Sequence, residues 1–244
     1  MSTPLFLFGP DGEQWNKYAA GDQRWPLGTK LVLQDGRQYR FAKAGAAALV
    51  VGDVLQAPAN VANDVGRAGI AAAVGSYAPT LTLGGATTAN LYAEGYWMNA
   101  VANASALGGG ESYKIDNHLA GTTAVVFNLA AGNALRTAID TTTRVALIQN
   151  PYKGVIQVPV TTPTGINVGV AVSIIALTGF GWIQTQGMAA VLTSGTVTLG
   201  AGVATIAVAA AAGPIAAIAT NAPIGFCQRV AASGAWSSIM LTLP

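Results

Sequence analysis

The stretch TKLVLQDGRQYRFA, residues 29–42, decides the fold class of this chain. Apolar and polar residues alternate on both sides of Asp35-Gly36, and such alternation is typical of a β-strand with one buried face. Asp-Gly is the pair favoured in a two-residue type I′ turn, in which both central residues have a positive φ. The stretch therefore predicts a β-hairpin with a type I′ turn.

Short alternating segments bounded by turn residues continue along the chain. We expect two strands around a turn at residues 150–154 and a final pair joined by Ala232-Ser233-Gly234. Residues 134–140 fit either a short helix or a loop. The other strand candidates are residues 48–58, 80–85, 90–101, 111–116, 123–130, 166–175, 179–195 and 196–203. About a dozen short strands without a clear amphipathic helix predict an all-β fold, with a β-sandwich or barrel-like body.

Composition divides the chain into three parts. Residues 1–27 carry Trp15, Tyr18 and Trp25 among polar residues, together with three prolines, which predicts an extended N-terminal arm. Residues 28–160 are interpreted as a β domain. Residues 161–244 form either a second, charge-poor β domain or a continuation of the same β body.

Charge is scarce in this protein. Charged residues make up 9% of the chain, against about 25% in an average soluble domain, and residues 154–228 contain no Asp, Glu, Lys, Arg or His. A monomer with so few charges would have an association-prone surface. We therefore expect other subunits to cover much of it, with residues 154–228 at the contacts. Because no basic run exceeds one residue, direct binding of nucleic acid is not expected.

The uncharged stretch 201–222 is long enough for a membrane span. However, it is rich in Ala, lacks Leu and Phe, and contains Gly213-Pro214, so its chemistry does not favour insertion. It predicts a tightly packed strand followed by a loop, or a short helix over residues 207–212. The N-terminus lacks the basic and apolar regions of a signal peptide. The lone Cys227 excludes an internal disulfide and is compatible with a reducing cytoplasm.

No catalytic, metal or cofactor site is expected. His118 is the single histidine, and Asp116, two residues away, would share its face of a regular strand and could orient it as a base. A loop histidine without a catalytic role is the favoured interpretation. The glycine-rich segments 108–112 and 179–182 do not continue as phosphate- or dinucleotide-binding motifs.

Four segments, taken in order, resemble capsid decoration, or cement, proteins of tailed bacteriophages. They are residues 25–58, residues 91–118 (LYAEGYWMNAV with GESYKIDNH), residues 144–159 (RVALIQNPYKGVIQVP) and residues 181–197 (GWIQTQGMAAVLTSGTV). The C-terminal PIGFCQRVAASGAWSSIMLTL is similar to the closing strands of small cement proteins. The resemblance implies a β-rich, commonly trimeric protein, bound outside the major capsid shell and without catalytic residues.

We therefore expect a non-enzymatic virion protein, made in the bacterial host cytoplasm and bound to the major capsid protein on the outer capsid surface. The alternative is another virion component: a head fibre, a tail part or a glycan-binding surface protein. Aromatic and basic residues of the first third are candidates for the capsid or subunit interface, although the aromatics could equally hold the arm to its own domain. These candidates are Trp15, Tyr18, Trp25, Arg37, Arg40 and Lys43.

Overall fold

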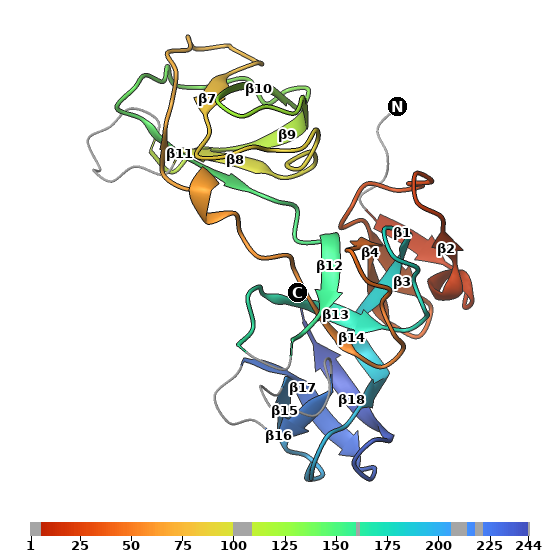
Figure 1. Ribbon diagram of the computed structural model, residues 1–244. Coiled ribbons are helices and arrows are strands. Elements are labelled where there is room, and N and C mark those ends of the chain that lie inside the picture. The colour runs from red at the N-terminus through yellow and green to blue at the C-terminus, as the bar shows by residue number, and fades with distance from the viewer. Residues whose placement is uncertain (1–5, 100–108, 160–161, 206–213, 218–221, 244) are drawn as a thin grey trace. The chain divides into compact units, whose positions relative to one another are not determined.

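The computed structural model describes residues 6–99, 109–159, 162–205, 214–217 and 222–243. Within them the protein is nearly all β (Figure 1), which confirms the predicted fold class. Helical structure in this part is limited to two 3₁₀ turns, η1 (Glu13–Trp15) and η2 (Ala62–Asp64).

The chain forms two compact units. Unit 1 combines Met1–Ala59 with Pro151–Pro244, and unit 2 is Asn60–Asn150. The strands of unit 1 are β1 (Phe6–Gly9), β2 (Lys17–Tyr18), β3 (Lys30–Leu33), β4 (Gln38–Ala44), β5 (Val54–Gln56), β12 (Lys153–Gln157), β13 (Asn167–Ala171), β14 (Phe180–Leu192), β15 (Gly202–Thr205), β16 (Ile215–Ala217), β17 (Pro223–Arg229) and β18 (Trp236–Thr242). The strands of unit 2 are β6 (Arg67–Ala68), β7 (Thr80–Thr82), β8 (Tyr96–Asn99), β9 (Ser112–His118), β10 (Ala124–Leu129) and β11 (Arg144–Ile148).

The predicted hairpin is present as β3 and β4, but its turn differs from the prediction. Gly36 has a φ of 85°, whereas Asp35 is not among the residues with positive φ. The amide of Leu33 donates to the carbonyl of Arg37, and the amide of Gly36 donates to the carbonyl of Leu33. This is a three-residue loop with glycine in the left-handed position. The extra residue explains why a two-residue type I′ turn is not formed.

Five strands of unit 1 close into a first barrel. β4 pairs with β12, β12 with β5, β5 with β13, β13 with β14, and β14 with β4 again. Small and branched side chains fill its interior, because only these fit the narrow ring. They include Ala42, Leu55, Val168 and Ile183, all buried in one cluster.

A second barrel shares β14 with the first. After a register shift between Gln184 and Gln186, β14 leaves β4 and pairs with β18. Gly187 lies next to this shift and has a φ of 85°, a conformation that glycine adopts without strain. The ring continues through β17, β15 and β16, and Ile215 of β16 bridges back to Thr193 just after β14.

Unit 2 is also a barrel-like closed sheet. Its strand order is β6-β11-β8-β9-β10-β7, and a bridge between Gly69 and Leu81 joins its two edges. Large aromatic side chains fill this barrel, among them Trp97, Tyr92 and Phe127. The ring of Phe127 lies edge-on to those of Tyr92 and Trp97, a favourable arrangement for aromatic pairs.

The compact units do not follow the predicted domain boundaries. Unit 2 is inserted between β5 and β12 of unit 1, so residues 28–160 span both units, and residues 161–244 continue unit 1. Strands were expected on both sides of residues 150–154, and β11 and β12 are there. They do not pair with each other, because β11 pairs within unit 2 and β12 within unit 1.

Residues 6–27 likewise belong to unit 1. β1 pairs in parallel with β3, and β2 pairs with β14. Residues 134–140 are neither helix nor strand apart from a single bridge at Ile139. The helix considered for residues 207–212 lies outside the described residues.

Candidate interaction surfaces

The outer side of the second barrel is an apolar surface, called here the C-terminal face (Met188, Ala190, Leu192, Phe226, Trp236 and Met240). Met188, Met240 and Phe226 are Cα partners in one row across β14, β18 and β17. Trp236 lies opposite Leu192 at the other end of β14 and β18. Phe226 and Trp236 are 54% and 53% exposed. The face therefore offers large side chains in register to a partner.

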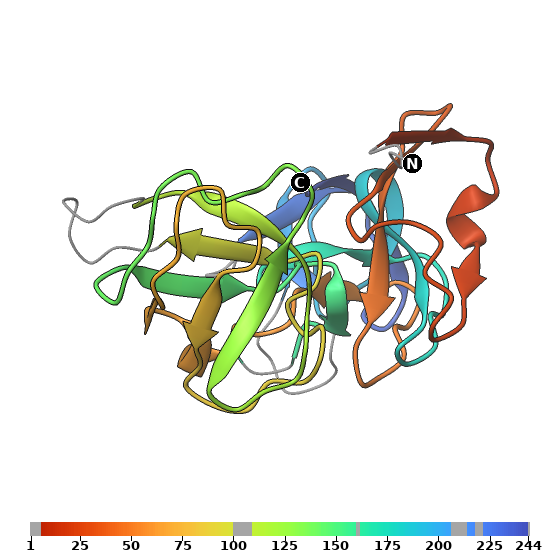
Figure 2. The same cartoon turned by 90° about the horizontal axis from the view of Figure 1, so that it is seen from above.

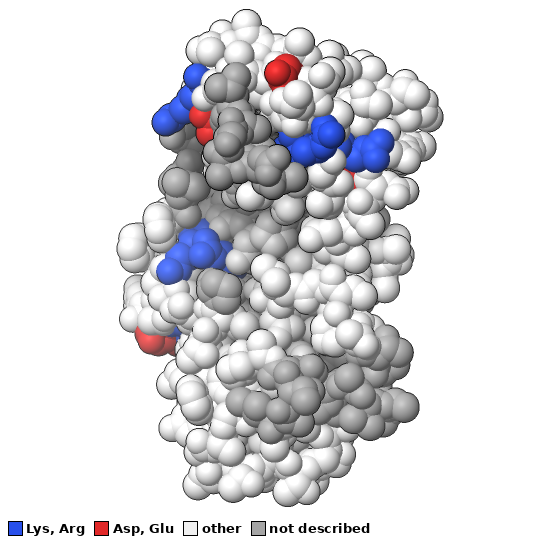
Figure 3. Space-filling view, turned by 90° about the vertical axis from the view of Figure 1, so that its left-hand side faces the viewer, with Lys and Arg blue, Asp and Glu red and all other residues white. Residues whose placement is uncertain are grey.

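Charge is almost absent around this face. Arg229 is the one charged residue in the sequences of β14 to β18. Figure 3 shows one side of the molecule, and none of the described residues visible in the lowest part of that view is coloured as Lys, Arg, Asp or Glu. Interface cores are depleted in charged residues in the same way.

The strands that form the C-terminal face carry apolar residues on both of their sides, the one that faces the barrel interior and the one that faces outward. On β18, Ile239 and Leu241 are buried in the barrel, while Trp236 and Met240 point outward. Apolar residues on both faces are typical of a strand that is covered on both sides. This double pattern in AWSSIMLTL is the sequence signal that could have identified the face.

A second surface lies on the sheet formed by β1, β3 and β4 (Figure 2), and is called here the N-terminal edge surface (Phe6, Phe8, Lys30, Val32 and Arg40). Leu7 packs inward against a cluster that contains Leu31 and Leu33. Phe6 and Phe8 point the other way, and Phe8 is 85% exposed. The predicted interface included Arg40 but none of the other four residues.

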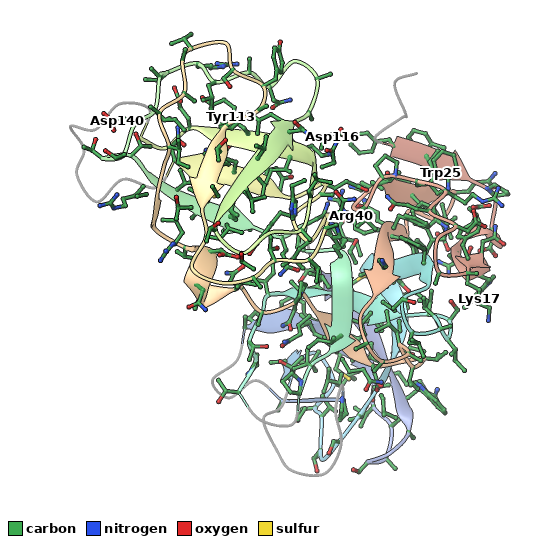
Figure 4. The ribbon with its side chains drawn as sticks, turned by 45° about the horizontal axis from the view of Figure 1, so that its top comes forward. Lys17, Trp25, Arg40, Tyr113, Asp116 and Asp140 are labelled. Carbon is green, nitrogen blue, oxygen red and sulfur yellow. The ribbon has the colours of Figure 1, made fainter. Side chains whose placement is uncertain are left out.

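The three aromatic candidates have different environments. Tyr18 packs edge-on against Phe41, with ring centroids 5.9 Å apart. Trp25 packs against the same cluster and is half-buried (Figure 4). Trp15, in η1, is 52% exposed. Tyr18 and Trp25 therefore hold residues 6–27 to unit 1, and Trp15 alone of the three presents most of its side chain to solvent.

The three basic candidates are not gathered into one site. Arg37 forms ion pairs with Asp35 and Asp11 at the hairpin turn. Arg40 donates to the carbonyl of Gly28 at 3.0 Å. Lys43 lies over the ring of Phe180. The charge of Arg37 is thus balanced within the molecule, which leaves less of it for a partner.

His118 and Asp116 do not share a face of β9, contrary to the prediction. Pairing between β9 and β10 shifts at Asp116, where a bulge leaves this residue exposed and turns His118 into the core. The amide of Tyr92 donates to His118 Nε2, so His118 Nδ1 carries the proton and donates to the carbonyl of Leu119. Both ring nitrogens therefore serve the structure of unit 2.

Unit 2 also contains a polar cavity of about 270 Å³ beside Glu111 and Arg136. The carboxylate of Glu111 accepts hydrogen bonds from the hydroxyls of Tyr113, at 2.5 Å, and Thr137, at 2.8 Å. Burial, and then this hydrogen bond to Glu111, raise the pKa of Tyr113. Because the carboxylate is occupied by partners from its own unit, we assign it a structural role.

A larger cavity of about 660 Å³ lies in unit 1 and has no charged residue in its lining. Its walls include Ile166, Pro163, Pro223 and Leu243. Such a hollow can take an apolar group but offers no general acid or base. In the described part of the chain, no three His, Cys, Asp or Glu residues are grouped so as to hold a metal ion.

Among the described residues, no helix has both the length and the apolar character needed to cross a membrane. Comparison with protein families, curated proteins and solved structures found no match to this chain.

Proposed function

We propose that this protein is a capsid decoration protein, which binds the outer surface of an assembled bacteriophage shell and stabilises it. The uncharged C-terminal face carries this proposal. Exposed Phe226, Trp236 and Met240 on one face are costly for an isolated protein in water, and they stabilise one whose surface is covered by neighbours. The resemblance of residues 25–58, 91–118, 144–159 and 181–197 to cement proteins supports the same function.

The C-terminal face suits contact between copies of this chain, most simply as a homotrimer. A surface without charge can meet another copy of itself without placing like charges together. Burial of apolar area contributes roughly 25 cal/mol per Å², a stabilisation that salt does not screen. In this proposal the C-terminal face joins copies, and other surfaces of the protein bind the major capsid protein.

Decoration would stabilise the shell by mass action. A protein that binds the assembled shell and not its dissociated subunits shifts the equilibrium toward assembly, by about 2.7 kcal/mol per site at 100 times the dissociation constant. Summed over many equivalent sites, this modest term resists the pressure of packaged DNA. No catalytic group is required.

Counting copies in intact particles tests the proposal. A decoration protein should saturate the shell at a fixed ratio to the major capsid protein, and particles stripped of it should release DNA at a lower temperature. Adding the purified protein back should restore heat stability. A few copies per particle would indicate a fibre or tail part, and unchanged heat stability of stripped particles would remove the decoration function.

A matched pair of variants tests the C-terminal face. Phe226→Glu places a charge on that face and should abolish self-association in sedimentation experiments. Tyr77→Glu places the same charge at a similarly exposed aromatic residue of unit 2 and should leave self-association unchanged. Equal behaviour of the two variants would show that the C-terminal face is not the contact.

A further inference from the structure

β1 is an edge strand that lacks the usual protection against pairing. It is the first strand in the order of its sheet and pairs only with β3. In the described part of the chain, the backbone groups on its other side therefore face no strand. Natural edges are commonly blocked by charged residues, Pro or bulges. β1 instead has the sequence FLFG, with Phe6 and Phe8 exposed.

Two cations lie on the same face of the sheet as these aromatic rings, and one of them, Lys30, lies over the ring of Phe6. Lys30 is the Cα partner of Phe6 on one side and of Arg40 on the other, so all three side chains share one face of the sheet. The Nζ of Lys30 is 5.8 Å from the centroid of the Phe6 ring. Like charges placed directly opposite each other on neighbouring strands are destabilising.

No carboxylate within the described residues compensates these cations. The ion pairs in that part of the chain involve Arg24 and Arg37, not Lys30 or Arg40. The nearest acids along the chain are already paired, since Asp35 forms an ion pair with Arg37 and Asp22 forms one with Arg24. The N-terminal edge surface thus combines apolar rings, an open strand edge and uncompensated positive charge.

We propose that β1 accepts an extended segment of a partner protein as an additional strand, and that every second residue of this segment, on one face, is apolar and acidic in turn. Its backbone would pair with the open edge of β1, as in other cases of strand addition. On the face that carries Phe6, Phe8 and Lys30, an apolar side chain would cover Phe8, and the acidic side chain beside Phe6 would approach Lys30. A second copy of this chain fits poorly, because it brings another Lys30 and Arg40 and no carboxylate to that surface.

This inference deepens the proposed function. The identification of the partner as the major capsid protein rests on that proposed function. The experiment uses the full-length protein and needs no particle. The probe is the capped eight-residue peptide Val-Thr-Glu-Thr-Val-Thr-Glu-Thr, which presents Val and Glu on one face, compared with the same peptide with Lys in place of Glu. Binding of this Val–Glu peptide and this Val–Lys peptide is followed by NMR at about 0.1 M salt, where the Debye length is about 10 Å.

The Val–Glu peptide should shift the amide signals of residues 6–9 and slow their hydrogen exchange, and the Val–Lys peptide should not. Lys30→Glu should weaken binding of the Val–Glu peptide about tenfold or more, and the variant should still fold because the new carboxylate faces Arg40. The control, Lys17→Glu, changes the same charge elsewhere in unit 1 and should weaken binding less than about twofold. Phe8→Ser should also weaken it at least about tenfold.

The proposal is overturned if neither peptide binds, if both bind equally, or if the shifts map away from β1. Protection of the β1 amides in concentrated protein without peptide would show that a second copy occupies the edge. Each of these outcomes is independent of the copy number in particles. Failure of strand addition is therefore distinguishable from failure of the decoration function.

Discussion

The side chain of Gln157 donates a hydrogen bond to Asp53, a carboxyl group that is 4% exposed beside the first barrel. The second carboxyl oxygen of Asp53 has no hydrogen-bond partner among the described residues. One hydrogen bond does not replace the lost hydration, so burial raises the pKa of Asp53 from 3.8 to about 6. Unit 1 thus contains an acid whose ionisation opposes folding.

Stability should therefore depend on pH through Asp53. Because its folded pKa is raised, the folded state binds more protons than the unfolded state between about pH 4 and pH 6, and stability falls as pH rises through this window. Asp53→Asn should remove the cost of ionisation and stabilise unit 1 at pH 8 by up to about 3 kcal/mol, at about 1.4 kcal/mol per pKa unit. At pH 4 the variant and the wild type should be similar in urea unfolding.

Asp35→Asn is the control of opposite sign. Hydrogen bonds from Arg37 lower the pKa of Asp35, so the native carboxylate contributes stability at neutral pH that is lost in acid. Its removal should destabilise the protein at pH 7 and have little effect once the wild-type carboxyl is protonated. If both variants show the same pH dependence, Asp53 is not the group responsible.

Gly52 should not tolerate a side chain. Its φ is 87°, and an added Cβ would lie 2.3 Å from Nε1 of Trp236. We expect Gly52→Ala to lower the melting temperature and to cost more than about 2 kcal/mol, because the variant adds overpacking to backbone strain. Gly36→Ala is the control, with a φ of 85° but open space around its Cβ, and should cost only about 1–2 kcal/mol. Equal losses would show that the contact with Trp236 gives way at no cost.

Deletion of residues 1–27 should destabilise unit 1. An arm that left the body could be removed without loss, but here the deletion takes away β1, β2 and the ring of Tyr18 against Phe41. The smaller change Tyr18→Ala should cost about 3 kcal/mol or less, because the ring is half-buried. Thermal unfolding checks both. An unchanged midpoint for the deletion would show that these residues do not support the fold.

Tyr92→Phe should destabilise unit 2. The hydroxyl of Tyr92 donates to Asp64 at 2.5 Å in the core, and burial and this hydrogen bond raise its pKa. Loss of a hydrogen bond to a buried carboxylate costs about 1.5–3 kcal/mol. Tyr77→Phe removes the hydroxyl of an exposed tyrosine in the same unit and should be neutral. Near-UV circular dichroism during urea unfolding compares them, and a neutral Tyr92→Phe would show that the hydrogen bond to Asp64 does not stabilise unit 2.

Local pattern was sufficient for the elements but not for all of their details. Alternation around Asp35-Gly36 predicted β3 and β4, because every second side chain along a strand faces the core. The type of turn was mispredicted, because one additional loop residue changes the backbone geometry without changing the flanking pattern. For the same reason the bulge at Asp116 was missed, and with it the burial of His118.

The sequence was enough to predict an all-β fold and to show that the protein carries little charge. Tertiary structure alone decided that β14 belongs to two barrels, that β11 and β12 lie in different units, and that Phe6, Phe8, Trp236 and Met240 are exposed. The physical reason is the separation along the chain between the residues that interact. Alternation and turn chemistry act between neighbours along the chain, whereas strand pairing and side-chain burial depend on residues that only folding brings together.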